Sequence, residues 1–521
     1  MTDSRAKAEK PLLKDKSMWL SMGASMIAFV LNMACSFFLT PYLIRNVGKA
    51  EYSFFPLAAS FVSYISIVTV ALNSMAGRFV TIAMHRQQID EAREYFNAVF
   101  FSSVVFTLIM LPLGGFFIYR IDHFLQVPPE SLYNIQILFW LVLVCLLLGQ
   151  LGSVLNIATY YKDKLYLTSF AQAVGYVVKV GSAVLLFSLL TARIYYVGVM
   201  SVCVAITTIA FNFFYTRCFL PEMTIGRHFF RLKRIWELVS SGVWNSISQL
   251  SNILLGGLDL LIANKYLGPE TSALIAVSKT IPHNVLALLS AVGHVFQPRY
   301  ARQYALDKHE ELVESVKSSM QLIGVLACCP IGFLLALGMP FYHLWVPSMD
   351  AMTLQILSIL GIGVLLISIS IQPVYGIFVI TNKVKVNSLV VLGTGVLNVG
   401  CVVILLHFTE GQFARMLVIV GVSTVIGILR NLFFTLPYAS MCLGIPFFFF
   451  YKTVGKILLC FLVCTAIYFS VSKLCTPTTW VRLLACGFGG SIINVGLLWQ
   501  FVLTKAQRQS ILATIRAKLG R

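Results

Sequence analysis

The chain has 521 residues, of which 58% are hydrophobic and only 11% are charged, and this composition excludes a soluble globular protein. The net charge of +19 could favour nucleic acid, but the basic residues stand in short segments between apolar runs, without an RNA-binding aromatic motif. Apolar runs of 18 or more residues recur along the sequence, and each can cross a hydrocarbon core about 30 Å thick. We therefore predict an all-α polytopic membrane protein with no nucleic-acid partner.

In chain order, the apolar runs predict fourteen transmembrane helices, arranged as two six-helix lobes and a C-terminal helix pair. The expected spans lie near 18–44, 53–75, 97–119, 133–158, 166–190, 193–216, 235–262, 271–296, 318–339, 352–380, 386–407, 412–437, 454–472 and 481–503. The expected domains are a cytoplasmic tail (1–17), an N-lobe (18–216), a basic inter-lobe linker (217–234), a C-lobe (235–440), an extra helix pair (441–504) and a basic amphipathic cytoplasmic tail (505–521). The first tail lacks a small-residue cleavage site behind a short apolar core, so we interpret it as a retained tail and not a signal peptide.

The distribution of lysine and arginine between these spans predicts the orientation of the chain. With a cytoplasmic N-terminus, the inner segments hold 28 of the 39 basic residues and the outer segments hold 8. Basic residues favour the cytoplasmic side of a membrane, so both termini are predicted to be cytoplasmic.

A stretch near the start of each lobe occurs twice and indicates a duplication. The first copy runs from Val47 to Val99 and the second from Leu267 to Met320, and the glycines that open them, Gly48 and Gly268, stand 220 positions apart. Six spans per lobe make the repeat parallel, with an axis along the membrane normal, which is the arrangement of transporters that work by alternating access.

Three basic side chains and one acidic side chain fall at bilayer depth within the expected spans, where charge is costly and usually functional. They are Lys179, Lys279, Arg430 and Asp259. Three cations against one acid predict a positive cavity that attracts an anion, and phosphate is the anion expected on a lipid carrier. Lys179 could instead be structural, and Arg430 could extend to the cytoplasmic surface.

Asp259 and Lys279 are predicted to lie at similar depth, because a tight turn around Gly268 joins their helices. They could form a structural ion pair or a coupling site at which Asp259 exchanges a proton or a sodium ion. Arg45 and Lys265 precede the paired glycines, and they are either interfacial anchors or cations at the outer mouth of the cavity.

Uncharged polar residues add to the predicted cavity lining. Polar positions recur along the seventh span at Asn245, Ser248, Asn252 and Asp259, and the N-lobe contributes Asn32 and Asn73. His283 follows Pro282 in the eighth span, and it is either a proton carrier or a packed, hydrogen-bonded imidazole.

Signatures of catalysis are absent from the sequence. It has no nucleotide-binding loop, no His-Glu-x-x-His motif and no nucleophile elbow. Its twelve cysteines lie mostly inside apolar runs without histidine or acidic residues at metal spacing, so we interpret them as packing residues. We predict neither an enzyme nor a metal site, and no cofactor beyond a possible H⁺ or Na⁺ gradient.

The segment Phe37–Gly48, followed by Glu51 and Tyr52, resembles the first-span signature of Wzx-type polysaccharide transporters of the multidrug/oligosaccharidyl-lipid/polysaccharide (MOP) exporter superfamily. The resemblance implies a MATE-like fold with a V-shaped pair of six-helix bundles. It also implies a flippase that moves an undecaprenyl-pyrophosphate-linked oligosaccharide, a precursor of polysaccharide, O-antigen or capsule, across the bacterial cytoplasmic (inner) membrane. The implied partners are this lipid-linked substrate, membrane lipids, and polysaccharide polymerase and assembly proteins.

Three other functions are compatible with the same pattern. The extra helix pair resembles that of lipid II flippases, but Met18–Thr40 lacks the arginines typical of their first span. A cation-coupled multidrug exporter of the same superfamily would favour an acidic cavity. A scaffold for polysaccharide assembly would not depend on its buried polar residues.

Overall fold

The structure is a computed structural model that describes residues 16–162, 164–294, 296–475 and 477–501. Every regular element in these ranges is a helix, which confirms the predicted all-α polytopic fold. Contacts divide the chain into two compact units, residues 1–253 (the N-terminal unit) and 254–521 (the C-terminal unit). The predicted C-terminal tail, and all but the last two residues of the predicted N-terminal tail, lie outside the described residues.

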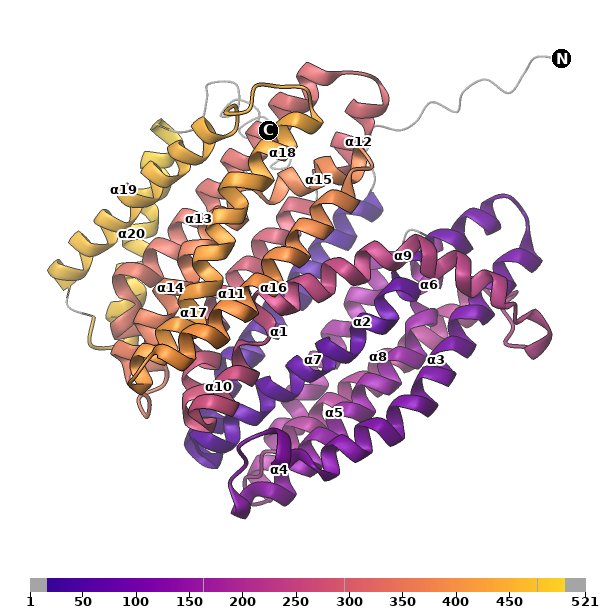
Figure 1. The fold of residues 1–521 in the computed structure, drawn as a ribbon, viewed down its shortest axis with the longest axis horizontal. Coiled ribbons are helices and arrows are strands. Elements are labelled where there is room, and N and C mark those ends of the chain that lie inside the picture. Colours follow the sequence, from indigo (N-terminus) through magenta and orange to yellow (C-terminus); the bar gives the residue numbers. More distant parts are fainter. Residues whose placement is uncertain (1–15, 163, 295, 476, 502–521) are drawn as a thin grey trace. The chain divides into compact units, whose positions relative to one another are not determined.

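The N-terminal unit is a bundle of long apolar helices. These are α1 (Lys16–Val47), α2 (Lys49–His85), α3 (Ile89–Tyr119), α5 (Leu132–Gly152), α7 (Leu165–Leu189), α8 (Tyr196–Phe219) and α9 (Leu232–Asn252), with the short α4 (Ile121–Phe124) and α6 (Ile157–Tyr161) between them (Figure 1). The tightest pairings are α2 with α9, α1 with α7, and α7 with α8. Val80, Phe96 and Leu238 are fully buried in one cluster where α2, α3 and α9 meet.

The C-terminal unit is built around α13. Its helices are α10 (Asp259–Leu267), α11 (Pro269–His294), α12 (Gln297–Ala305), α13 (His309–Trp345), α14 (Ala351–Ser370), α15 (Gln372–Ile380), α16 (Val384–Phe408), α17 (Gln412–Arg430), α18 (Leu436–Cys442), α19 (Tyr451–Cys475) and α20 (Trp480–Phe501). α13 packs along both α14 and α19. More than half of the most apolar part of α11 and of α13 is buried, so these two helices form the core of the unit.

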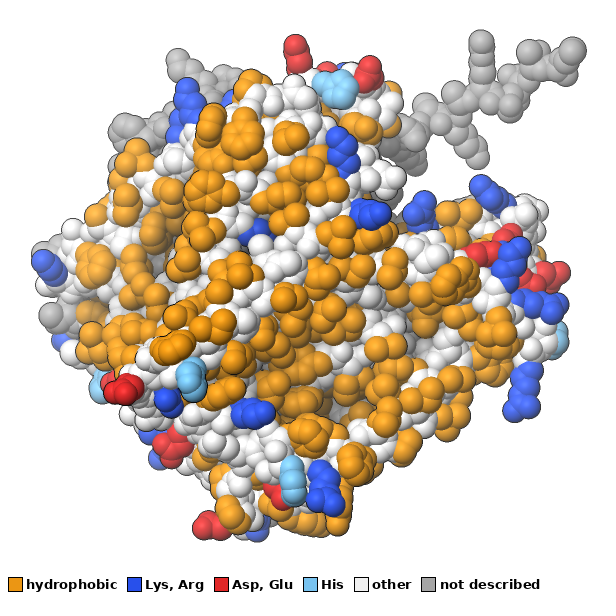
Figure 2. Space-filling model, viewed as in Figure 1, with side chains coloured by type: hydrophobic (Ala, Val, Ile, Leu, Met, Phe, Trp, Pro, Cys, Tyr) orange, Lys and Arg blue, Asp and Glu red, His pale blue; other side chains and the backbone are white. Residues whose placement is uncertain are grey.

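Thirteen helices in the described part of the chain are long and apolar enough to cross a membrane. They coincide with the first thirteen predicted spans. The fourteenth prediction, 481–503, coincides with α20 as far as the described residues reach. Figure 2 shows hydrophobic side chains over the middle of the helices and most charged side chains near helix ends, which is the distribution expected of a protein in lipid.

The backbone repeats the predicted duplication at two corners in each unit. Gly48 joins α1 to α2 with φ +100°, and Gly268 joins α10 to α11 with φ +90°, a region that favours glycine. Gln87, before α3, and Asp307, before α13, are non-glycine residues with φ of 59° and 57°. Both pairs are separated by 220 positions, so corresponding turns recur along the two halves of the sequence.

The compact units divide inside the seventh predicted span (235–262), after α9. This division arises because α9 packs along α2: a Cβ atom on Gly242 would lie only 2.0 Å from the carbonyl oxygen of Ala71. In the first turn of α9, Arg234 forms ion pairs with Glu91 and Glu94 of α3. The contact boundary thus lies later than the predicted linker at 217–234, and the predicted lobe boundaries stay a prediction.

Candidate functional site

The first feature of the candidate site is a π-helical turn, Ile253–Gly257, between α9 and α10. A π-turn leaves backbone carbonyls without their usual helical partners, and such turns often occur at functional sites. Asn398 of α16 supplies hydrogen bonds to two of these carbonyls, because its Nδ2 donates to the carbonyl oxygens of Leu254 and Leu255, each at 3.1 Å. Its own Oδ1 is buried and accepts no hydrogen bond from any described residue.

The ion pair between Asp259 and Lys279 lies directly beside this turn. Lys279 Nζ donates to Asp259 Oδ2, and it also lies 3.4 Å from the carbonyl oxygen of Gly256. The Asp259 side chain is only 3% exposed, whereas that of Lys279 is 32% exposed. The predicted proximity of these two residues is confirmed, and the pair exists as an ion pair in this structure.

His283 follows Lys279 by one turn of α11 and is exposed. The residue before Lys279, Ser278, anchors this part of α11: its carbonyl oxygen lies 3.4 Å from the Tyr342 hydroxyl of α13. The same hydroxyl lies 3.0 Å from Ser358 Oγ of α14. These contacts fix α11 against α13 and α14, so Lys279 is held on a packed and well-anchored helix.

Arg430 stands at a second π-turn, Asn431–Thr435, which ends α17. Its guanidinium donates to Asn431 Oδ1 at 3.1 Å, and the Tyr375 hydroxyl donates to the same oxygen at 3.3 Å. Asn431 is fully buried and donates in turn to Ser368 Oγ at 2.9 Å. Among the described residues no carboxylate pairs with Arg430, so its charge is held by a neutral amide and remains available to an anion.

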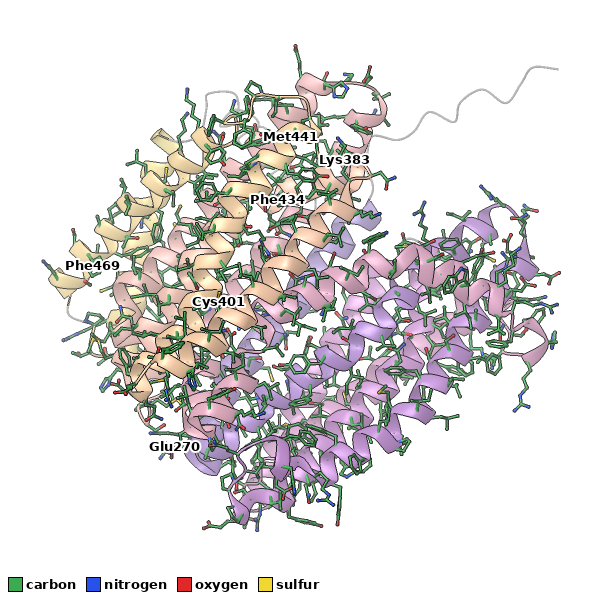
Figure 3. The ribbon with its side chains drawn as sticks, viewed as in Figure 1. Glu270, Lys383, Cys401, Phe434, Met441 and Phe469 are labelled. Atoms are coloured by element: carbon green, nitrogen blue, oxygen red, sulfur yellow. The ribbon has the colours of Figure 1, made fainter. Side chains whose placement is uncertain are left out.

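Figure 3 places Phe434 in this second π-turn. Its ring stacks on that of Tyr438 of α18 with the centroids 5.1 Å apart. The stacking helps to fix the π-turn against the next helix.

Lys179 is the only predicted cation at mid-span in the N-terminal unit. It lies one turn after Gly175, which is buried and packs against Val204 of α8, so both residues belong to the packed side of α7. Lys179 is half-buried, and no described carboxylate forms an ion pair with it. Cys145 of α5 is close enough to experience its charge. The position is compatible with both predicted roles, cavity-facing and structural.

A polar cluster in the same unit contains Asn73. Its Nδ2 donates to Gln150 Oε1 at 3.2 Å, and its Oδ1 accepts from Ser153 Oγ at 3.3 Å. Gln150 Nε2 continues the chain of hydrogen bonds to Ser103 Oγ at 3.3 Å. Asn73 therefore links α2 to α5 and α3, and its amide is engaged within the unit.

The other predicted positions differ in exposure. Asn245 is half-buried and donates to Ser74 Oγ at 3.1 Å, and Asn32 is half-buried on α1. Arg45, Lys265 and Asn252 are exposed. Arg45 and Lys265 both stand in the last turn of the helix before a corner glycine, as the sequence predicted.

Residues 18–303, more than half of the chain, match the family model described as polysaccharide biosynthesis protein. The chain belongs to the polysaccharide biosynthesis protein family. This family member is 27% identical over 509 residues to the uncharacterized membrane protein EpsK of Bacillus subtilis (strain 168), over 96% of this chain and 98% of EpsK.

Solved transporter structures share the fold of this polysaccharide biosynthesis protein. The lipid II flippase MurJ in an inward closed conformation has a TM-score of 0.64 at 12% identity, covering 92% of this chain and 99% of MurJ. An inward-facing multidrug resistance MATE transporter of the MOP superfamily has a TM-score of 0.59 at 14% identity, covering 82% and 98%. The family match agrees with the predicted polysaccharide family, and the likeness to the MurJ and MATE structures confirms the predicted MATE-like fold. The family, the many candidate membrane helices and the similar membrane protein of Bacillus subtilis together show a multi-pass membrane protein.

Several polar residues of this family member were not singled out in the sequence. Asn398, Asn431, Gln150 and Tyr375 all hydrogen-bond to candidate residues or to the π-turns that carry them. A lone amide within an apolar run was the available signal, since polar side chains are costly in lipid. Its partners belong to other helices and could not be identified from spacing.

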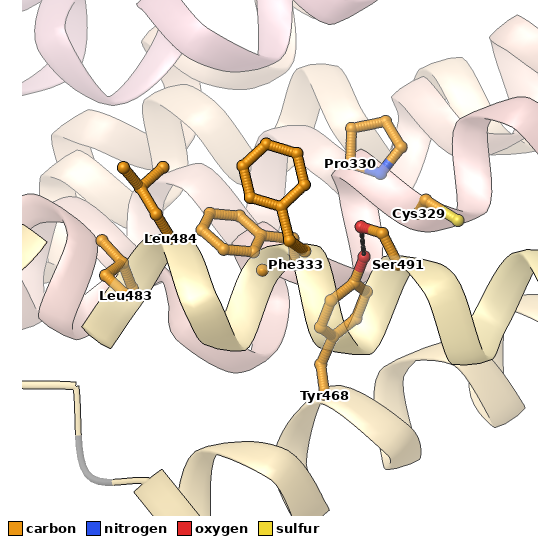
Figure 4. Close-up of a pocket in the computed structure, with 9 residues that line it drawn as sticks. Cys329, Pro330, Phe333, Tyr468, Leu483, Leu484 and Ser491 are labelled. Carbon is orange, nitrogen blue, oxygen red and sulfur yellow. Dashed lines mark hydrogen bonds between the residues drawn. The ribbon is translucent and has the colours of Figure 1, made fainter. Parts of the chain in front are cut away.

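A cavity of about 300 Å³ lies apart from these residues, where α13, α19 and α20 meet. Its walls are mostly apolar, and its polar groups lie together near Cys329, where the Tyr468 hydroxyl is hydrogen-bonded to Ser491 Oγ at 2.7 Å (Figure 4). It contains no charged side chain, so it cannot hold an anionic group by charge.

Proposed function

We propose that this protein moves an undecaprenyl-pyrophosphate-linked oligosaccharide from the inner to the outer leaflet of a bacterial cytoplasmic membrane. Transport would proceed by alternating access through a cationic cavity. In this proposal, the pyrophosphate and sugars occupy the cavity, the prenyl chain stays in lipid, and a proton or sodium gradient drives the cycle. Both termini lie in the cytoplasm, and polysaccharide polymerase and assembly proteins act on the product.

The cations in the helices are the observation that supports this substrate. Lys179 and Arg430 have no carboxylate partner among the described residues, and a third of the Lys279 side chain is open. A cation at bilayer depth is unfavourable unless a polar environment or an anion compensates it. A pyrophosphate offers several oxygens to such cations in a low-dielectric setting, where the attraction is strong.

The family supports a substrate of polysaccharide assembly over an organic cation. Organic cations would be repelled by the same three positive side chains. The lipid II flippase alternative shares the pyrophosphate chemistry, so it differs from the proposal in the sugar and not in the anion.

The test is a translocation assay in proteoliposomes with a fluorescent undecaprenyl-pyrophosphate oligosaccharide. Wild type is expected to move the lipid, and Lys179→Ala is expected to lose at least about tenfold in rate, since a charge-assisted contact contributes more than about 1.4 kcal/mol. Lys473→Ala, an exposed lysine in the last turn of α19, is the matched control and should keep the wild-type rate.

Two results would decide against the proposal. A wild-type protein that leaves this lipid in place but exports an organic cation would be a drug exporter. A wild type that moves lipid II faster than the oligosaccharide carrier would be a lipid II flippase.

A folded Lys179→Ala variant that moves the lipid at the full wild-type rate would show that Lys179 does not belong to the binding site.

A further inference from the structure

The ion pair between Asp259 and Lys279 is asymmetric in its access to the surroundings. The carboxylate is 3% exposed and the ammonium is 32% exposed. An anion that approaches this place therefore meets Lys279 and not Asp259. Because Lys279 Nζ can turn about its flexible side chain, it can contact such an anion only by weakening its contact with Asp259.

Asp259 cannot remain charged once Lys279 has turned away. A buried carboxylate without a counter-charge is strongly unfavourable, and protonation is the usual way to remove the charge. The carbonyl oxygen of Gly256 contacts the same ammonium and is therefore a second acceptor for Lys279 within this site. The π-turn is what makes this carbonyl available.

We infer that Lys279 is exchanged between Asp259 and the pyrophosphate of the substrate, and that Asp259 takes up one proton from water when the exchange occurs. This inference rests on the proposed function and names the protonation step that accompanies anion binding at its site. A proton taken up at the inner leaflet and returned at the outer leaflet moves outward with the lipid, so this exchange is separate from the step at which an ion gradient drives transport. Charge is conserved in the exchange: the pair begins as ammonium and carboxylate, and it ends as ammonium with the anion and a neutral carboxylic acid. Release of the anion reverses the step and returns the proton.

Other groups on the helices packed around the pair can also exchange a proton. α14 has none, whereas α11 itself carries His283 one turn from Lys279. On the other helices packed against α10 and α11, and on α16, such groups include Cys328, Cys329, Tyr342, His343, Tyr375, Cys401 and His407, whereas Arg415 and Arg430 stay protonated. His283 is an imidazole one turn from Lys279 on the same helix, so its variant is a necessary control.

The experiment measures proton uptake on ligand binding. Farnesyl pyrophosphate and inorganic pyrophosphate are titrated into the purified full-length protein in detergent by calorimetry, in buffers of different ionisation enthalpy. Wild type is expected to take up about one proton more per bound ligand than Asp259→Asn, which reports the protonation of the ligand alone. Asp259→Asn is also expected to bind several-fold more tightly, because Lys279 no longer has to leave a carboxylate.

His283→Gln should keep the additional proton, and the double variant Asp259→Asn/Lys279→Met should lose about tenfold in affinity relative to Asp259→Asn. Wild type and Asp259→Asn with equal proton uptake would overturn the exchange while leaving the proposed function intact. Loss of the proton in His283→Gln, with its retention in Asp259→Asn, would move the step to His283 and would also overturn it. A wild type that binds neither pyrophosphate would contradict the proposed substrate class and the exchange together.

Discussion

Removing one partner of the buried ion pair is expected to destabilise the protein by different amounts for the two residues. Lys279→Met leaves an acid that is 97% enclosed and must either stay charged without a counter-charge or take up a proton, and breaking a buried pair in this way costs about 3–5 kcal/mol of unfolding free energy. Asp259→Asn leaves an ammonium that is a third exposed and can turn toward a polar surrounding, so its cost is about 1 kcal/mol. The double variant Asp259→Asn/Lys279→Met carries no charge and is expected to be within about 1 kcal/mol of wild type.

Reversible unfolding in mixed detergent micelles, followed by tryptophan fluorescence, provides the four free energies of this cycle. Lys473→Met is the matched control for a lysine at an exposed position and should change stability by less than about 0.5 kcal/mol. Equal destabilisation by the two single variants would refute the argument from exposure. A double variant as unstable as Lys279→Met would show that packing, and not charge, determines the effect.

Two further predictions concern packing and capping. Gly242→Ala should reduce the yield of folded protein and its thermal stability, because the added methyl group would overlap the Ala71 carbonyl. Gly149→Ala on α5 is the control and should be neutral, because the space around Gly149 is open. Equal losses for the two variants in size-exclusion and melting profiles would refute the close contact. Asp350 caps the N-terminus of α14, and hydrogen bonds from the hydroxyl and the backbone N–H of Thr353 lower the pKa of its carboxyl group. Asp350→Ala should therefore cost about 0.5–2 kcal/mol of stability at neutral pH. A lowered pKa in the folded state means that this stabilisation is present above the ordinary carboxyl value and is lost as the pH falls through the folded one. The stability difference between wild type and Asp350→Ala should therefore shrink as the pH is lowered below the ordinary carboxyl value, and a difference that stays constant until acid unfolding would contradict the cap.

The spans could be predicted from the sequence because apolar length is dictated by the bilayer, whatever the tertiary contacts are. The corner glycines were also accessible, since a positive φ restricts the choice of residue, as Gly48 and Gly268 show. The proximity of Asp259 and Lys279 followed from one tight turn between two helices. These are all local constraints, and local constraints are visible in a sequence.

The π-turns could not be predicted, because no residue type specifies them and their carbonyls depend on side chains from other helices. Asn398 lies 143 positions from the nearer carbonyl that it caps, and spacing alone gives no indication of that contact. The end of the N-terminal compact unit depends in the same way on the fit of Gly242 against α2. Which cations lack a carboxylate also required the packed structure, because exposure and pairing are tertiary properties.

The unequal exposure of the two members of the ion pair has a consequence for the resting protein. A buried acid that water could reach would exchange protons with both sides of the membrane and dissipate the gradient without moving any substrate. Here the lysine neutralises an acid that is only 3% exposed, and in the proposed exchange Asp259 takes up a proton only when an anion draws the lysine away. The ion pair between Asp259 and Lys279 thereby prevents a proton leak that is not accompanied by substrate transport.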